Sequence, residues 1–307
     1  MVNIHGSRGL GLASAALSLA LGACDQGSSS NLTDGEAGAA APASAQSGSS
    51  GVSSTIGGAG SGGSAGASAA GTAGTSATCQ RPAGMPAVSL TYDDSLPSDI
   101  SNAAPALAKH QLKATFFVMD VRGDTAPWAA LRAQGHELGS HTFKHPCPKV
   151  NTWVAAGDAN EDYDLTRMEV ELDDSITMLM SMGQTAPFTF AYPCGIDWVG
   201  EDHQSYVPLI QARFSAARGV VPGVVKPGAN LTKVAATFST GDAAALIAIA
   251  DGAISGGGWV VFGFHGVGAD HTPVTLEAHE ALLAHLDDHR GEIYVGTFGE
   301  LAACLAP

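Results

Sequence analysis

The chain has 307 residues, of which 39 are Gly, 15 are Pro and only 14% are charged, and its formal net charge is −15. Nucleic-acid binding requires clustered Lys and Arg, so 14 basic residues against 29 acidic ones argue against a nucleic-acid partner. Because glycine and acidic residues are unevenly spread, the chain is interpreted segment by segment.

Residues 1–23 are typical of a lipoprotein signal peptide. Arg8 supplies a positive flank, and the apolar run from Leu10 to Leu21 is shorter than the about 20 residues that a spanning helix needs. The run leads into Leu21-Gly-Ala-Cys24, which is similar to a bacterial lipobox, whose cysteine is lipidated and becomes the new N-terminus. An ordinary signal peptide followed by an incidental cysteine is the alternative. We expect an exported lipoprotein, anchored in the cell envelope through Cys24 on its periplasmic or outer-surface face.

Residues 24–78 are mainly Gly, Ser, Ala and Thr, with almost no large apolar side chains. Such a segment cannot bury enough surface to offset its ordering entropy, so we predict a disordered linker. A flexible chain of this length has an end-to-end distance on the order of 40 Å. It would act as a tether for a globular domain, which we place at residues 79–307.

From Cys79 onward, short β-rich runs alternate with helical periods over a length typical of one domain. Alternation of strands and helices predicts an α/β domain with a parallel sheet, either open or closed into a barrel. The expected strands are 87–92, 114–118, 189–192, 214–217, 259–264 and 292–295. Two amphipathic helices are expected, 164–182 with Leu165, Met168, Leu172, Ile176 and Met180 on one face, and 275–289 with Leu276, His279, Leu283 and Leu286.

Four cysteines remain if Cys24 is lipidated, an even number in an exported protein, where disulfides persist. Three pairings are possible. Cys79 and Cys304 bracket the domain, so a bridge between them would join its two ends and leave Cys147 to pair with Cys194. Free buried thiols are the alternative.

Two carboxylates and two histidines suggest a metal site. His141 and His145 are four positions apart, so on a helical turn both imidazoles would leave the same face and bind one ion. Asp93 and Asp94 end the first strand and point to opposite sides of an extended chain. If the backbone bends there, one binds the metal while the other addresses a bound water. The set predicts a His₂–carboxylate site with positions open for water and substrate.

The chain resembles the NodB-homology polysaccharide deacetylases, carbohydrate esterase family 4, from about Met85 to Ala303. Four motifs carry the resemblance in the family's order: Thr91-Tyr-Asp-Asp94, His141-Thr-Phe-Lys-His145, Phe190-Ala-Tyr-Pro-Cys-Gly195 and Gly263-Phe-His-Gly266. The first two are specific, and the last is short. The resemblance implies a distorted (β/α) barrel with its site at the carboxyl ends of the strands.

The resemblance also implies a hydrolase that removes acetyl groups from a polysaccharide with a divalent metal. We expect Zn²⁺, with Co²⁺ or Ni²⁺ as alternatives, and the implied ligands are Asp94, His141 and His145. Asp93 would act as general base and His265 as general acid. By analogy with the family, the Cys194 amide would stabilise the oxyanion.

Two positions depart from the family pattern. The third motif usually begins with an arginine that orients the base, and here Ala191 stands in its place. A tyrosine usually precedes the final glycine, and here it is Cys194. Arg218 could supply a guanidinium near Asp93. An acidic partner for His265 is not evident, and Asp242, Asp251 and Asp270 are the candidates.

The predicted substrate carries N-acetyl groups on amino sugars, in chitin-like or peptidoglycan-like chains. An O-acetyl esterase acting on xylan, or a catalytically weak tethered relative that binds carbohydrate, are the alternatives. We expect recognition by loops such as 151–162 and 197–206, and a monomeric protein.

Overall fold

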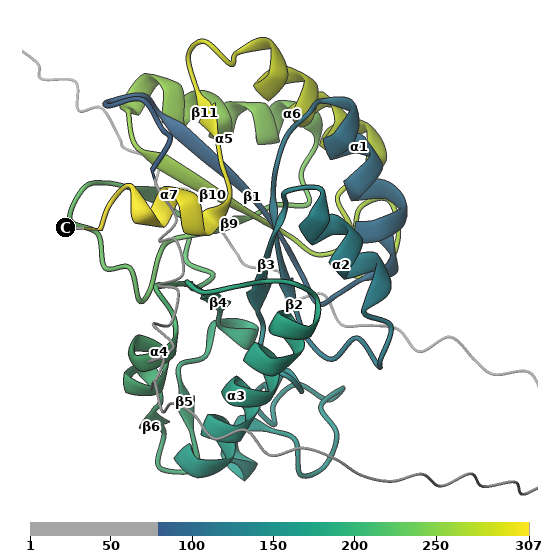
Figure 1. The fold of residues 1–307 in the computed structure, drawn as a ribbon, viewed down its shortest axis with the longest axis vertical. Coiled ribbons are helices and arrows are strands. Elements are labelled where there is room, and N and C mark those ends of the chain that lie inside the picture. Colours follow the sequence, from purple (N-terminus) through teal and green to yellow (C-terminus); the bar gives the residue numbers. More distant parts are fainter. Residues whose placement is uncertain (1–78, 307) are drawn as a thin grey trace, which may run out of the picture. The chain divides into compact units, whose positions relative to one another are not determined.

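A computed structural model describes residues 79–306 of the chain (Figure 1). The predicted signal peptide, lipidated Cys24 and linker lie outside the described residues. Within 79–306, no helix is both long enough and apolar enough to cross a bilayer.

A nine-stranded mixed sheet forms the centre of the described region. Its strand order is β7-β4-β3-β2-β1-β10-β8, with β11 also paired to β1 and β9 to β10. All pairs are parallel except β10 with β8. The strands are β1 (Ala87–Asp93), β2 (Thr115–Val118), β3 (Glu137–Ser140), β4 (Thr189–Ala191), β7 (Ala216–Arg218), β8 (Val224–Val225), β9 (Thr237–Phe238), β10 (Trp259–Phe264) and β11 (Tyr294–Val295), and a separate hairpin joins β5 (Trp198–Val199) to β6 (Gln204–Ser205).

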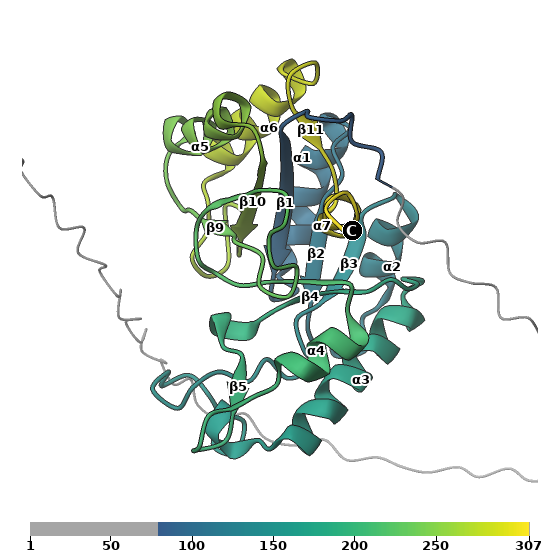
Figure 2. The same ribbon diagram turned by 90° about the vertical axis from the view of Figure 1, so that its left-hand side faces the viewer.

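The sheet curls into a distorted barrel, as the sequence predicts (Figure 2). The segment that follows β8 links its two edges. Val234 forms a parallel bridge with Arg218 at the β7 edge, and β9 then pairs with β10. The carboxyl ends of β1, β2, β3, β4, β7 and β10 therefore surround one end of the barrel.

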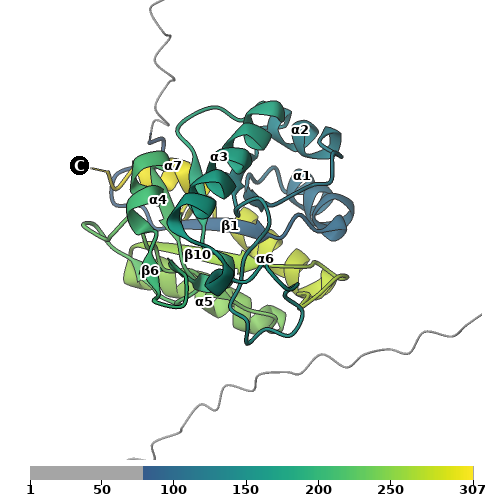
Figure 3. The same cartoon turned by 90° about the horizontal axis from the view of Figure 1, so that it is seen from below.

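Helices cover the outside of the barrel (Figure 3). α5 packs on α6 and contacts β1 and β10, while α2 and α3 contact β3. The α-helices are α1 (Ala104–Lys109), α2 (Ala126–Ala133), α3 (Leu165–Ser181), α4 (Val207–Arg213), α5 (Ala243–Gly256), α6 (Leu276–Asp288) and α7 (Phe298–Ala303), and shorter helical turns are η1 (Asp99–Ala103), η2 (Asn160–Asp162) and η3 (Pro193–Gly195).

Side-chain alternation along β1 separates the outer core from the barrel interior. Val88, Leu90 and Tyr92 join the core beneath the outer helices. Ala87 faces inward, in one cluster with Phe117 and with residues of β10, β4, β7 and α7. By the same period of two, Asp93 points into the barrel at its carboxyl end.

The six expected strands and both expected helices are present, and two helix faces require correction. Met168 and Leu172 of α3 are buried, but Leu165 is 36% exposed and Met180 61% exposed. Repeated steps of four residues drift about 40° each around a helix of 3.6 residues per turn, so the buried row continues through Ser175 and Leu179 instead. In α6, Leu276 is likewise exposed, whereas its other predicted face residues are buried.

Both favoured disulfides are confirmed. Cys79 is bonded to Cys304, which fastens the two ends of the domain to each other. Cys147 is bonded to Cys194, which connects the loop after β3 to the turn after β4.

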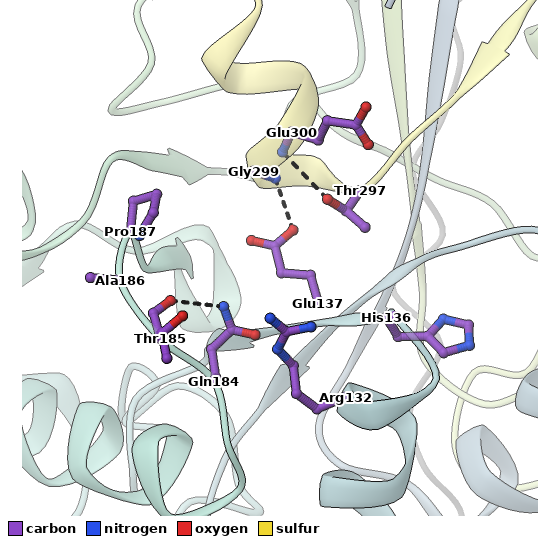
Figure 4. A pocket seen from close by; sticks show the side chains of 11 residues that line it. Arg132, His136, Glu137, Gln184, Thr185, Ala186, Pro187, Thr297, Gly299 and Glu300 are labelled. Atoms are coloured by element: carbon purple, nitrogen blue, oxygen red, sulfur yellow. Dashed lines mark hydrogen bonds between the residues drawn. The ribbon is translucent and has the colours of Figure 1, made fainter. Parts of the chain in front are cut away.

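Glu137, the first residue of β3, fastens α7 to the amino ends of the strands (Figure 4). Its buried carboxylate accepts hydrogen bonds from Thr115 Oγ1 at 2.8 Å, Thr189 Oγ1 at 2.6 Å and the Gly299 N–H at 2.8 Å. It borders a hollow whose wall includes Arg132 and Gln184. This end of the barrel lies opposite the ends that carry the predicted site residues.

Substitution Glu137→Ala is expected to lower the free energy of unfolding by about 3 kcal/mol, because three buried donors lose a charged acceptor. Urea unfolding followed by circular dichroism measures the change. The exposed Glu292→Ala is the matched control, for which less than about 0.5 kcal/mol is expected. Equal effects of the two substitutions would refute a structural role for the Glu137 network.

Candidate active site

The chain bends sharply at the end of β1, which is necessary if Asp93 and Asp94 are to act at the same site. Asp94 and Ser95 have φ of 73° and 56°, in the left-handed region that non-glycine residues rarely adopt. Ser95 Oγ accepts a hydrogen bond from the Met119 N–H at 2.9 Å, which holds this turn against the end of β2. The bend brings the carboxylates of Asp93 and Asp94 to the same side, within 3.7 Å and 3.3 Å of His141 Nε2.

His141 and His145 do not lie on a helical turn, and that expectation was wrong. They belong to an irregular loop after β3, in which Thr142 and His145 have φ of 59° and 55°. The His145 N–H donates to Thr142 Oγ1 at 2.9 Å, so a side chain replaces the helical backbone bond. The imidazoles still converge, with ring centroids 4.7 Å apart.

Glu171 of α3 holds this loop, a role that the sequence analysis missed. Its carboxylate accepts the N–H groups of Phe143 at 3.0 Å and Lys144 at 2.7 Å, and the Tyr163 hydroxyl at 2.8 Å. The available signal was a glutamate on the apolar face of α3, where a charge requires partners.

Asp94, His141 and His145 present three ligand atoms to one point. Asp94 Oδ1 lies 3.3 Å from each histidine Nε2. This oxygen is buried and has no hydrogen-bond partner among the described residues. Buried carboxylate oxygens are rarely left unpaired, so the arrangement fits a divalent cation among the three atoms.

The surroundings of the histidines leave each Nε2 free to bind metal. His141 Nδ1 lies 2.8 Å from the Ala191 carbonyl oxygen, which can only accept, so Nδ1 carries the proton. Burial, reinforced by the neighbouring His141, lowers the pKa of His145 to about 4. Burial raises the pKa of Asp94, but the close approach of His141 and the hydrogen bond with His271 outweigh burial and hold this pKa far below its usual range.

Arg218 at the end of β7 contacts Asp93, as the sequence hypothesis required. Its guanidinium is fully buried in the barrel and donates from Nη2 to Asp93 Oδ1. The carbon at its centre lies 4.6 Å from the Phe117 ring centroid and 5.1 Å from that of Phe238. Arg218 is the direct sheet neighbour of Ala191, so the guanidinium comes from the strand beside the one that carries the third motif.

His265 follows β10 and lies near Asp94, with His265 Nε2 3.6 Å from Asp94 Oδ2. None of the three candidate acids forms an ion pair with it in the described structure. Asp242 caps α5, Asp251 contacts His285 at 2.8 Å, and Asp270 accepts the Ser98 N–H at 2.9 Å.

His271 is the second residue that the sequence analysis missed. Its Nε2 lies 2.8 Å from Asp94 Oδ2, and its ring centroid lies 5.0 Å from that of His265. No motif includes His271, and only the folding of the loop after β10 brings it to the site.

Cys194 occupies a tight turn with φ of 53° and is tied by its disulfide to the loop of His145. Its N–H donates to no acceptor among the described residues. The turn is close-packed, since a Cβ on Gly195 would approach Val220 Cγ2 to 2.5 Å. The predicted oxyanion donor is therefore an unpaired amide beside the candidate metal ligands.

The sequence matches known proteins over part of its length. Residues 80–202 match the sequence profile of the polysaccharide deacetylase family. A chitooligosaccharide deacetylase of Sinorhizobium fredii is 41% identical over 66 residues, which cover 20% of this chain and 31% of that protein. The alignment thus spans less than a third of that relative. The matched region and the motifs together support a polysaccharide deacetylase with NodB homology.

Two solved structures share only distant similarity with the chain. Peptidoglycan deacetylase PdaC from Bacillus subtilis has 15% identity and a TM-score of 0.43, with 71% of this chain and 90% of that chain covered. A family 4 carbohydrate esterase from Streptomyces lividans in complex with acetate has 15% identity and a TM-score of 0.44, with 69% and 92% covered.

Substitution Glu171→Ala is expected to weaken metal binding by about 10–100-fold, because the loop that carries His145 loses its anchor. Competition with a chromogenic chelator measures the affinity. Glu169→Ala on the same helix is the control, since Glu169 is exposed and pairs with Arg213 at 2.5 Å. Wild-type affinity in Glu171→Ala, with the fold intact, would exclude the anchoring role.

Proposed function

We propose that the chain is an active, metal-dependent deacetylase that removes N-acetyl groups from amino sugars in a chitin-like or peptidoglycan-like polysaccharide. The observation that carries this proposal is the unpaired, buried Asp94 Oδ1, which faces two histidine Nε2 atoms beside an Asp93 carboxylate held by Arg218. The match of residues 80–202 to the polysaccharide deacetylase profile supports the reaction class.

Asp94, His141 and His145 would hold the metal, which when bound polarises an acetyl carbonyl and lowers the pKa of a bound water. Two imidazoles and one carboxylate favour Zn²⁺, and Co²⁺ or Ni²⁺ would also accept this set.

Asp93 is suited to accept the proton of the attacking water. Its two oxygens are divided between two tasks, since Oδ1 accepts from Arg218 and Oδ2 faces His141 Nε2 at 3.7 Å. The guanidinium fixes the orientation of the carboxylate, so Oδ2 remains available as the base.

His265 and Cys194 would assist the cleavage of the carbon–nitrogen bond in two different ways. The Cys194 N–H would donate to the acetyl oxygen as negative charge develops there. His265 would donate a proton to the departing nitrogen, which otherwise leaves as a poor leaving group. No covalent bond between protein and acetyl group is required.

The surface around the site supports a carbohydrate substrate. Trp153 is 61% exposed, and its ring centroid lies 6.1 Å from that of His145, so a sugar ring could stack on it beside the metal site. A hollow of about 240 Å³ also borders His265, with Phe238 and Thr272 in its wall. Trp153 lies in the loop 151–162, where the sequence suggests recognition.

We further propose that the catalytic domain acts at the cell envelope as a monomer. The support is the sequence of residues 1–24, with its apolar run and lipobox-like ending, and the linker that follows. Lipidation of Cys24 would hold the domain near a membrane without a spanning helix.

Acetate release tests the proposed reaction. The purified protein loaded with Zn²⁺ is expected to release acetate from N-acetylglucosamine oligomers, and a chelator is expected to abolish release. Acetylated xylan distinguishes the O-acetyl esterase alternative. Absence of release from either substrate, with metal bound, would favour a carbohydrate-binding relative without turnover.

Two variants separate metal binding from proton transfer in this assay. Asp94→Asn is expected to lose bound metal by elemental analysis, because a neutral amide replaces the charged ligand. Asp93→Asn is expected to keep its metal while turnover falls by about 10²–10⁴-fold. Equal metal content in wild type and Asp94→Asn would show that the site is wrongly assigned.

Substitution Arg218→Ala is expected to reduce turnover by about 10–100-fold, the loss equivalent to one charged hydrogen bond to the base. Arg218→Lys keeps a cation and should retain more activity, and the surface variant Arg213→Ala is the control. Circular dichroism reports folding in each case. Unchanged turnover in a folded Arg218→Ala protein would remove Arg218 from the mechanism.

A further inference from the structure

We propose that Asp94, His265 and His271 form a second divalent-cation site, and that a second Zn²⁺ bound there inhibits the enzyme. The inhibition rests on the proposed deacetylase function, whereas the binding site stands independently of it. Asp94 would bridge the two sites, with one carboxylate oxygen in each.

The two oxygens of Asp94 face two different pairs of imidazoles. Oδ1 faces His141 and His145, while Oδ2 lies 2.8 Å from His271 Nε2 and 3.6 Å from His265 Nε2. The second set, like the first, has its ligand atoms within 4.8 Å of one another. Two metals held a few ångströms apart by shared ligands are a common arrangement in hydrolases.

The loop that carries His271 is held in place by its own contacts. The Gly268 N–H donates to the Val274 carbonyl at 2.8 Å, and the Val274 N–H donates to the Gly266 carbonyl at 3.0 Å. A Cβ on Gly266 would lie 1.9 Å from the Ala269 carbonyl oxygen, so this closed loop requires glycine there. At its tip, the Asp270 carboxylate accepts the Ser98 N–H at 2.9 Å. His271 is thus presented to Asp94 by a braced loop.

The second site is open to solution. The side chains of His265 and His271 are 32% and 53% exposed, whereas those of His141 and Asp94 are 3% and 10% exposed. Asp270 adds a carboxylate next to His271 in sequence. A cation can therefore reach the site. Asp94 Oδ2 is already hydrogen-bonded to His271, and a cation would have to replace that bond, so we expect weaker binding here than at Asp94 Oδ1.

Occupation of this site would remove the proton donor of the reaction. A metal ion on His265 Nε2 takes the lone pair that must carry the proton to the leaving nitrogen. Activity should therefore rise as the first site fills and fall as the second fills. Turnover would therefore be low at both low and high zinc concentrations and highest in between.

The test is a zinc titration of the purified full chain, with bound metal counted after equilibrium dialysis and acetate release measured in parallel. The wild type should bind two zinc ions, one tight and one at least tenfold weaker, and lose activity as the second binds. His271→Ala should bind one and show no inhibitory phase. His285→Ala, which removes a histidine of α6 that contacts Asp251 of α5, should behave as the wild type does.

His271→Asn separates a metal ligand from a hydrogen-bond donor, because its amide can still donate to Asp94 but is a poor ligand for zinc. One bound zinc in this folded variant supports the second site. A single zinc in the wild type at all concentrations, or two in His271→Ala, would overturn the proposal. Two bound zinc ions without any acetate release would leave the site established and refute the deacetylase function instead.

Discussion

The ion pair between Asp93 and Arg218 crosses the interior of the barrel, and the candidate site depends on it. Its members end two strands, β1 and β7, that are separated in the sheet by β2, β3 and β4. They meet only because the sheet curls. Removing one partner of a buried pair costs about 3–5 kcal/mol, since it leaves an uncompensated charge. The contact that orients the proposed base is therefore also a constraint on barrel closure.

Much of the fold could be predicted because its signals are local. The apolar runs of β1 and β10 and the periodic faces of α3 and α6 are readable in the sequence, and the family's motif order supplies the barrel. The site residues of the first two motifs were identified because each motif is a short local pattern, although β3, the strand before His141, was not among the expected strands. Arg218 could be inferred because a strand ends there and the expected arginine is absent at Ala191, its direct neighbour in the sheet.

The remaining site residues depend on contacts between distant segments, which a single sequence does not encode locally. Glu171 reaches the His145 loop from the middle of a helix, and His271 reaches Asp94 from a loop without a motif. The helical turn expected for His141 and His145 failed for a related reason. A spacing of four residues is typical of a helix. Here the left-handed backbone at Thr142 and His145 brings the two imidazoles together without a helix.

Residues that stabilise the fold lie at the amino ends of the strands, and the candidate site residues lie at the carboxyl ends, as is usual for parallel barrels. At the amino ends, every oxygen of the Glu137 carboxylate has a donor, and the group serves to join α7 to the strands. At the carboxyl ends, Asp94 keeps one oxygen unpaired at a cost that folding alone does not explain. A buried acceptor left open beside two imidazoles is the feature of a site built for an ion. Because the other oxygen of Asp94 faces His265 and His271, the proposed metal site and the proposed proton donor both lie against the same carboxylate.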